Sequence, residues 1–255
     1  MALALLFTVS GCSMGGNDKY KVVDSFTQQQ FCAAFRLDDA VGQYVTAALL
    51  TLQADGEIST LSKKWFGSDV SLLQGDSEGL DEFTEIPART LIVGYDDGRM
   101  PFSGIGSGGQ PDGFDVSLAR AVCKKLGWKI RFIAIDVSQA QVELNSGNVD
   151  CVLGGYAYNK AESKIQQSPV YMESTIVIAS LAGSGIGNTG ALSKKILTLS
   201  DNSYHAAVLE ENPRLEEKLA LVNMVPGGTK ACFAALDSGS CDAIITDLAA
   251  LDYYR

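Results

Sequence analysis

The chain has 255 residues, enough for one large or two modest domains with hydrophobic cores, and 46% of its residues are hydrophobic. Its formal net charge of −10 argues against a nucleic-acid partner, because phosphate contacts need clustered Lys and Arg, and no basic run here exceeds two residues. With a single His and no Cys-x-x-Cys motif, we expect no metal site, and no motif in the sequence indicates a cofactor.

An apolar run opens the chain. Ala2–Val9 is far shorter than the ~20 residues that a membrane-spanning helix needs, and it leads into Val-Ser-Gly-Cys at 9–12 and a polar tether. This order resembles a bacterial lipoprotein signal, which implies that residues 1–19 are a signal and tether and that Cys12 carries a lipid anchor. A buried N-terminal strand or helix is the alternative. No Lys or Arg precedes the run, so a complete signal would start upstream.

The predicted elements of the first half surround an acidic linker. The stretch 68–88 combines Asp and Glu with Gly and Ser, which is typical of an exposed linker. Before it we expect a strand at Phe31–Phe35 and helices at Val41–Leu52 and Ile58–Trp65. After it we expect a strand at Thr90–Gly94, a helix at Phe114–Leu126 and a strand at Trp128–Ile135.

The second half gives further elements and a repeat. We expect strands at Thr175–Leu181, His205–Leu209 and Val222–Pro226 and a helix at Pro213–Leu221. Leu144–Leu153 resembles Leu236–Ile245, since each is a helix end, a Gly cap, an Asp and a buried strand. Chance similarity is possible, but the flanking elements share the same order. The sequence therefore predicts an α/β fold of two lobes, each with a parallel-rich sheet.

Five cysteines remain besides Cys12. An exported chain can form disulfides, and an odd number leaves at least one thiol free. Cys123, Cys151, Cys232 and Cys241 lie in apolar helix or strand patterns, where a buried inert thiol is the commoner outcome. Cys123–Cys151 and Cys232–Cys241 are the possible bridges.

Several motifs occur together that are known from one family. A strand with Asp, a Pro-Phe loop, a Gly-Phe-Asp helix start and a Leu-Gly helix end follow the linker. An Asp-x-x-x-x-Asp strand closes the chain, and an Asp-Gly turn with Lys-Trp-Phe-Gly precedes the linker. These motifs resemble type II periplasmic solute-binding proteins, the polar amino-acid class of ABC-transporter substrate-binding lipoproteins. The matching residues are Val93–Asp96, Pro101–Phe102, Gly113–Val116, Leu126–Gly127, Pro169–Tyr171, Asp242, Asp247, Asp55–Ile58 and Lys64–Gly67.

The order of these motifs is rotated, because the segment that closes the family's chain comes first here. The resemblance implies a circularly permuted two-lobed clamp, and a fragment of a tandem array is the alternative. The implied division is lobe 1 at 36–174, which contains the 68–88 linker between the ancestral termini, lobe 2 at 20–31 plus 182–255, and hinge strands at 31–35 and 175–181.

The resemblance also implies a ligand site in the cleft. Asp247 matches the Asp that pairs with a ligand's α-ammonium, and Asp96 is a cleft carboxylate or a turn cap. The family's Gly-x-Thr-x-Thr-x-x-Arg segment supplies Gly155, Ala157, Asn159 and Glu162 as further candidates. Arg99 stands where an aromatic residue usually stacks, and Glu211-Asn212 stands where Gly-Thr opens the second-lobe helix.

Glu162 replaces an Arg that would hold the ligand's carboxylate, so the local charge is inverted. Either Arg99 takes over the carboxylate, or the ligand is a cation that pairs with Asp96, Glu162 and Asp247. A solvent-facing Glu162 is the third possibility. Tyr156 and Tyr158 either line the pocket or pack in the core.

The sequence therefore predicts a monomeric extracytoplasmic binding protein, anchored to the outer face of the cell membrane or in the periplasm. It would capture a small polar solute, an amino acid or related amine, by hinge closure and pass it to an ABC permease. We expect no catalysis. The alternatives are a ligand-sensing or scaffold protein without transport, and a dehydratase or lyase that uses Glu162 as acid or base.

Overall fold

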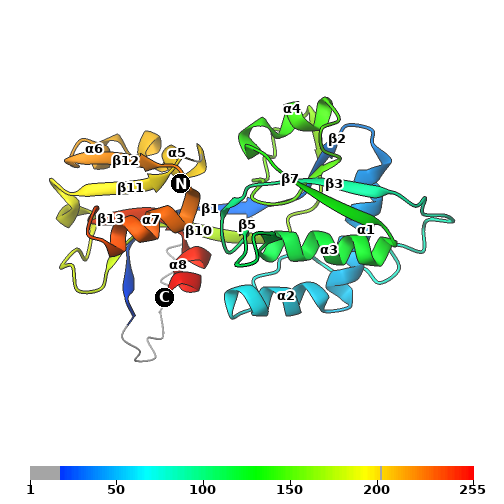
Figure 1. Ribbon diagram of the computed structural model, residues 1–255, viewed down its shortest axis with the longest axis horizontal. Coiled ribbons are helices and arrows are strands. Elements are labelled where there is room, and N and C mark those ends of the chain that lie inside the picture. Colours follow the sequence, from blue (N-terminus) through cyan, green and yellow to red (C-terminus); the bar gives the residue numbers. More distant parts are fainter. Residues whose placement is uncertain (1–17, 202) are drawn as a thin grey trace, which may run out of the picture.

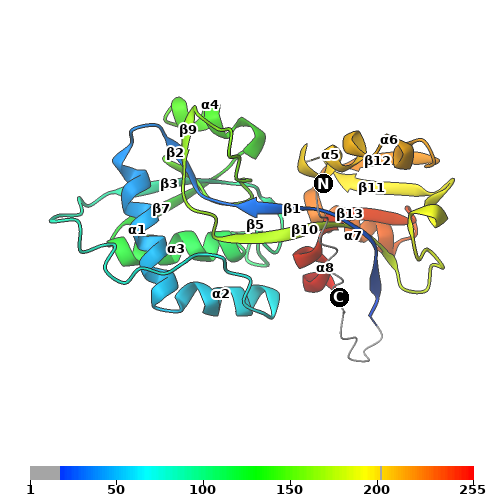
Figure 2. The same ribbon diagram turned by 180° about the vertical axis from the view of Figure 1, so that it is seen from behind.

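Two long antiparallel strands join the two lobes of the molecule (Figures 1 and 2). β1 (Tyr20–Phe31) pairs with β10 (Met172–Leu181), from Tyr20 opposite Leu181 to Phe31 opposite Met172. The structure is a computed structural model, and it describes residues 18–201 and 203–255. The predicted lipidation of Cys12 lies outside the described residues and stays a prediction.

The larger lobe, lobe 1, is built on a five-stranded sheet with the order β7-β3-β8-β2-β9. β3 runs parallel to β7 and β8, and β2 runs antiparallel to β8 and β9. α1, α2 and α3 cover one face and α4 covers the other (Figure 1). The elements are β2 (Ala34–Arg36), α1 (Ala40–Ala54), α2 (Glu57–Phe66), β3 (Thr90–Tyr95), α3 (Phe114–Leu126), β7 (Lys129–Ala134), a 3₁₀ turn (Val137–Gln139), α4 (Ala140–Asn145), β8 (Cys151–Val152) and β9 (Ile165–Gln167).

A small three-stranded sheet lies beside the end of β3. Its strands are β4 (Gly98–Arg99), β5 (Ser103–Ile105) and β6 (Pro111–Asp112), in the order β4-β5-β6. β6 leads directly into α3. The predicted helix at Phe114–Leu126 is confirmed at both ends, and Gly127 closes it with φ of +69° in the left-handed region.

The smaller lobe, lobe 2, has the sheet order β1-β10-β13-β11-β12, in which β11 is parallel to β12 and β13. Alternate residues of β10 and β13 face two different cores. Ile178 and Ile245 pack with α5 and α6, and Val177 and Ile244 pack with α7 and α8. The elements are a 3₁₀ turn (Thr189–Leu192), β11 (Ile196–Ser200), α5 (Ser203–Glu211), α6 (Pro213–Glu216), β12 (Leu221–Val225), α7 (Gly228–Asp237), β13 (Ala243–Asp247) and α8 (Leu248–Tyr254).

The sequence repeat performs the same structural task in both lobes. Asp150 accepts a hydrogen bond from the backbone N–H of Ile92 at 2.9 Å, and Asp242 accepts one from Ile196 at 2.9 Å. In each case the Asp also donates its own N–H to the carbonyl of the same strand residue. Asp150 therefore holds β3 beside β8, and Asp242 holds β11 beside β13. By this contact β3 of lobe 1 is equivalent to β11 of lobe 2.

Two sequence predictions in lobe 2 were wrong. His205–Leu209 lies inside α5 and is no strand, and the first strand of the lobe is β11. The helix predicted at Pro213–Leu221 is only the one-turn α6. A five-residue apolar run does not by itself distinguish a strand from one face of a helix, which explains the first error.

The possible disulfides Cys123–Cys151 and Cys232–Cys241 do not form, and these cysteines are the buried thiols that the sequence favoured. All five described cysteines (Cys32, Cys123, Cys151, Cys232 and Cys241) are buried free thiols. Burial raises the pKa of Cys123 to about 12 and that of Cys232 to about 12, so these thiols stay protonated. Their role is to fill the core.

Within residues 18–201 and 203–255, no helix has the length and apolarity needed to cross a membrane. The same residues bring together no cluster of three or more His, Cys, Asp or Glu side chains suited to a metal ion.

Candidate functional site

A buried ion pair between Arg99 and Asp247 connects the two lobes. Arg99 in β4 of lobe 1 donates from Nη2 to Oδ2 of Asp247 at 3.1 Å and to Oδ1 at 3.3 Å. Asp247 is the last residue of β13 in lobe 2. Each side chain is only 1% exposed. Carboxyl ends of parallel strands are the usual place of ligand sites in α/β folds, so this pair marks the candidate site.

The Arg99 guanidinium has further partners on four segments. Nη1 donates to the carbonyl of Gly155 at 3.1 Å, and Nη2 donates to Oε1 of Gln29 in β1 at 2.7 Å. The guanidinium carbon lies 4.9 Å from the ring centre of Phe31 and 5.3 Å from those of Phe102 and Tyr204. Both lobes and the connecting strand therefore surround this one cation with oxygen acceptors and aromatic rings.

The charges of the pair are strongly stabilised by each other. Burial acts to raise the pKa of Asp247, but Arg99 and the His205 Nε2 at 3.3 Å outweigh it and hold that pKa at about 2. Burial acts to lower the pKa of Arg99, and Asp247 and Asp96 raise it above its ordinary value. Asp247 is therefore an anion and Arg99 a cation at neutral pH.

Asp96 and Gly155 form the lobe 1 wall of the site. Asp96 follows β3 and accepts a hydrogen bond from the N–H of Gly98 at 2.8 Å, and burial raises its pKa. Gly155 has φ of +84°, and a Cβ added there would lie 3.4 Å from Arg99 Cδ and 3.6 Å from Asp96 Cβ. The structure therefore brings Asp96, Arg99, Gly155 and Asp247 together, and their role in ligand binding stays a prediction.

Asp115 fixes the loop that carries Gly155. Its Oδ2 accepts the N–H of Gly155 at 3.1 Å, and its Oδ1 accepts the hydroxyl of Tyr171 at 2.8 Å. Burial raises the pKa of Asp115 to about 6 against these two hydrogen bonds. In the sequence Asp115 is only part of a Gly-Phe-Asp helix start, and its contacts with Gly155 and Tyr171 arise from the fold.

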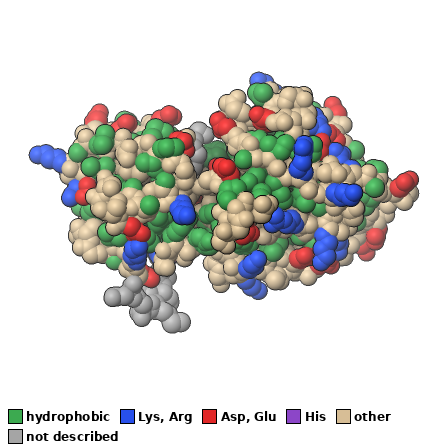
Figure 3. Space-filling view, viewed as in Figure 1, with side chains coloured by type: hydrophobic (Ala, Val, Ile, Leu, Met, Phe, Trp, Pro, Cys, Tyr) green, Lys and Arg blue, Asp and Glu red, His purple; other side chains and the backbone are tan. Residues whose placement is uncertain are grey.

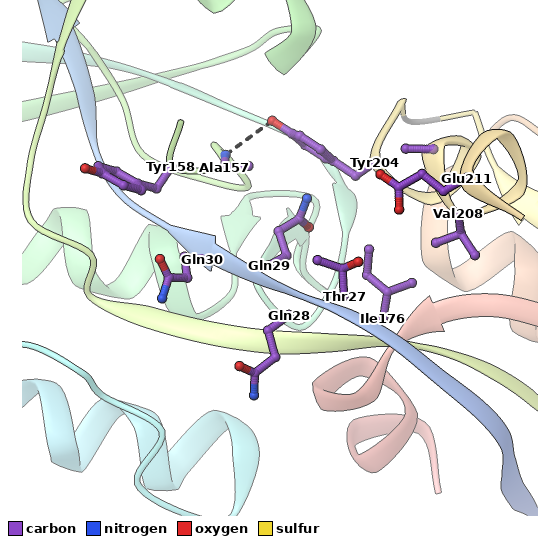
Figure 4. A pocket seen from close by; sticks show the side chains of 11 residues that line it. Thr27, Gln28, Gln29, Gln30, Ala157, Tyr158, Ile176, Tyr204, Val208 and Glu211 are labelled. Atoms are coloured by element: carbon purple, nitrogen blue, oxygen red, sulfur yellow. Dashed lines mark hydrogen bonds between the residues drawn. The ribbon is translucent and has the colours of Figure 1, made fainter. Parts of the chain in front are cut away.

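Two further contacts hold the lobes together. The hydroxyl of Tyr204 in α5 accepts the backbone N–H of Ala157 in lobe 1 at 3.2 Å (Figure 4). At Gly228, the first residue of α7, φ is +68°, and an added Cβ would lie 1.9 Å from the carbonyl oxygen of Gly98. The lobes therefore also meet at these two points besides the ion pair, and the space-filling view shows them joined at a narrow waist (Figure 3).

A groove of about 500 Å³ runs beside the ion pair, along β1 and between the lobes. Gln29 and Tyr204 belong both to this groove and to the surroundings of Arg99. Glu211 of α5 and Tyr158 of lobe 1 also line the groove (Figure 4). A solute could reach the edge of the Arg99 site from here.

Asn159 and Glu162 form hydrogen bonds within lobe 1 and none with Arg99 or Asp247 in the described part of the chain. Glu162 Oε1 accepts the N–H groups of Ser163 and Lys164, and Asn159 Oδ1 accepts that of Ala161. A ligand role for these two residues stays a prediction. Glu211 ends α5, and Asn212 is the N-cap of the one-turn α6, so a helix does begin at the predicted position.

Sequence reasoning missed the residues that complete the surroundings of Arg99. Gln29 lies in a strand that was not predicted, and Tyr204 precedes a run that was assigned to a strand. Phe31 and Phe102 were noted only as parts of a hinge and a loop. No local signal distinguishes these four from ordinary polar and core residues.

Comparisons with known proteins agree on one family. The profile of the bacterial extracellular solute-binding proteins, family 3, matches residues 91–220. A probable histidine-binding protein of Neisseria gonorrhoeae is 26% identical over 175 residues, 66% of this chain and 62% of that protein. The arginine-binding extracellular protein ArtP of Bacillus subtilis (strain 168) is 34% identical over 104 residues, 40% of each chain. The chain thus spans less than two thirds of these two curated relatives.

A solved structure gives the same relationship. An ABC uptake transporter substrate-binding protein from Streptococcus pneumoniae, with bound histidine, is 26% identical and superimposes with a TM-score of 0.57. The match covers 65% of this chain and 68% of that one.

Proposed function

Because the chain belongs to the bacterial extracellular solute-binding proteins, family 3, we propose that it captures an amino acid or a related amine between its lobes for an ABC importer. The observation that carries this proposal is the Arg99–Asp247 pair, which sets a cation and an anion face to face across the two lobes. The family is extracellular or periplasmic, which is where such capture takes place.

The pair is complementary to an amino-acid zwitterion. When the lobes part, Arg99 remains on lobe 1 and Asp247 on lobe 2. A zwitterion can then enter between them, with its carboxylate on Arg99 and its ammonium on Asp247. The Nε–H of Arg99 is buried and has no acceptor within the described part of the chain, so a carboxylate would gain a second hydrogen bond there. Closure onto the solute keeps both charges paired.

A thermal-shift screen with single amino acids and small amines tests this function. A saturating solute at 100 times its Kd stabilises the folded state by about 2.7 kcal/mol, which for a chain of this size raises Tm by roughly 5–11 °C. Asp247→Asn should abolish the shift because the ammonium loses its partner. Absence of a shift with every solute would contradict the proposal and favour a scaffold role, since a ligand-sensing protein would also be stabilised by its solute. Conversion of the solute would favour the dehydratase or lyase alternative, in which Glu162 acts.

We also propose that the order of the elements is circularly permuted, with lobe 1 at 36–174 and lobe 2 at 20–31 plus 182–255. β2, α1 and α2 come before the 68–88 linker yet pack against the lobe 1 elements that follow it. The family match begins at residue 91, and the share of this chain covered by the S. pneumoniae structure is about the share that follows residue 90. The two ends of the described chain are neighbours, since Tyr20 and Tyr254 both contact Phe233 at ring-centre distances of 5.0 and 4.4 Å.

Moving the ends of the chain tests the permutation. We expect the fold to survive a cut within 68–88 combined with a Gly/Ser linker between residues 255 and 18. Circular dichroism and thermal unfolding would check this. A matched cut within α1, which is part of the lobe 1 core, should prevent folding. Loss of folding in the first variant would count against the permuted order.

The strand pairing supports a small change in the proposed hinges. Phe31 and Met172 belong to the lobe 1 core, whereas Ile176 pairs with Asp247 in lobe 2. The crossing between lobes is therefore best placed at 28–31 and 172–175, next to the 31–35 and 175–181 segments inferred from the sequence.

A further inference from the structure

The surroundings of Arg99 have the composition of a receptor for a free guanidinium ion. The cation meets the Asp247 carboxylate, the Gln29 amide oxygen and the Gly155 carbonyl at 2.7–3.3 Å, and it lies near three aromatic rings. These groups come from both lobes and from β1. Only a planar cation with several N–H donors can use all the oxygen acceptors at once.

We propose that this chain carries a guanidinium-binding site between its lobes and that its own Arg99 occupies the site in the absence of solute. The side chain acts as an intramolecular ligand, because it is attached to lobe 1 while its charged partner Asp247 is attached to lobe 2. This proposal rests on the proposed function in one respect, which is that the solute binds in the same cleft. A solute must therefore compete with Arg99 for Asp247, and the lobes close without one.

Three features of the structure favour a guanidinium site that Arg99 occupies over an ion pair that only stabilises the core. Asp247 is fully buried, and Arg99 is the one Lys or Arg that the described residues place against its carboxylate. The lobes already meet through Tyr204 with Ala157 and through Gly228 with Gly98. The neighbouring groove reaches Gln29 and Tyr204, which gives a small cation a route to the site.

Removing the arginine side chain and supplying guanidinium separately tests the proposal. Arg99→Ala should open the lobes, which small-angle X-ray scattering records as a larger radius of gyration. Guanidinium chloride at low millimolar concentration, far below denaturing levels, should return the radius to the wild-type value and raise Tm. Sodium chloride at equal concentration should do neither. Wild-type protein should show no rise in Tm, because its site is filled.

Two control variants test whether guanidinium acts at the site around Asp247. In Arg99→Ala/Asp247→Asn, rescue by guanidinium should need about tenfold more ligand or more, because the charge-assisted hydrogen bonds are lost. Lys125→Ala removes an exposed cation that pairs with Asp55 and should neither open the lobes nor respond to guanidinium. Equal responses of the single and double variants, or an Arg99→Ala protein that stays closed, would overturn the proposal.

A measurement on the wild-type protein covers the case in which Arg99→Ala does not fold. Nuclear magnetic resonance of the solute-free protein should show Arg99 side-chain N–H signals that are resolved and exchange slowly, unlike those of the more exposed Arg255. Averaged, rapidly exchanging Arg99 signals would show an empty site and overturn the proposal. Neither test uses an amino acid, so they can succeed or fail independently of the thermal-shift screen.

Discussion

Asp247→Asn should lower the free energy of unfolding by about 3–5 kcal/mol, which is the cost of leaving a buried charge without its partner. Arg99 is 1% exposed and has no second carboxylate in hydrogen-bond contact among the described residues. An amide in place of the carboxylate keeps the shape of the side chain but removes its charge. Urea unfolding followed by circular dichroism measures the loss.

The exposed pair of Asp55 with Lys125 provides the matched control. Its side chains are 45% and 33% exposed, so Asp55→Asn should cost only about 0–1 kcal/mol. Replacing both partners of the buried pair, as in Arg99→Met/Asp247→Leu, should recover part of the loss, because no uncompensated charge remains. Equal costs for Asp247→Asn and Asp55→Asn would contradict the assignment of a buried, coupled pair.

The same carboxylate should control stability in acid. The folded pKa of Asp247 is about 2, below the ordinary value of 3.8. A depressed pKa gives stability that is fully present above pH 3.8 and is lost as the pH falls towards 2. Wild-type protein should therefore lose stability over this interval through Asp247, and Asp247→Asn should lack that part of the pH dependence.

Gly228→Ala should prevent the lobes from closing. A Cβ at this position would lie 1.9 Å from the Gly98 carbonyl oxygen, which is backbone of the other lobe. Backbone atoms cannot move aside as a flexible side chain can, so the lobes must separate. We expect a larger radius of gyration in small-angle scattering and, since the solute is held between closed lobes, at least about tenfold weaker solute binding.

Gly239→Ala separates this clash from the conformational cost. Gly239 has φ of +72°, close to the +68° of Gly228, but nothing lies within 4 Å of its added Cβ. Both variants bear the roughly 1 kcal/mol penalty of a left-handed non-glycine residue. Only Gly228→Ala should change the lobe separation. The same radius of gyration in both variants would show that the Gly98–Gly228 contact does not set the closed state.

Features that depend on neighbouring residues were predictable from the sequence. The helix at Phe114–Leu126 is set by its apolar spacing and the glycines at its ends, and the repeat is set by a Gly-capped turn followed by Asp. The helix and the Gly-capped turn depend on residues close in the chain, whereas the Asp contacts with Ile92 and Ile196 span 58 and 46 positions and were found only in the structure. The choice of Asp96, Arg99, Gly155 and Asp247 as site candidates came from the motifs of the family that the chain resembles.

What the sequence did not determine is which partner each of these residues takes. Arg99 and Asp247 are 148 positions apart and lie on different lobes, so their pairing exists only because the lobes close around β1 and β10. The same holds for Gln29, Tyr204 and the Gly98–Gly228 contact, which bring no local pattern with them. By itself, the sequence determined two α/β lobes and the residues at the ends of their strands. Only the tertiary structure decided that the chain's own arginine fills the space between them, because distances across a cleft depend on how whole lobes pack.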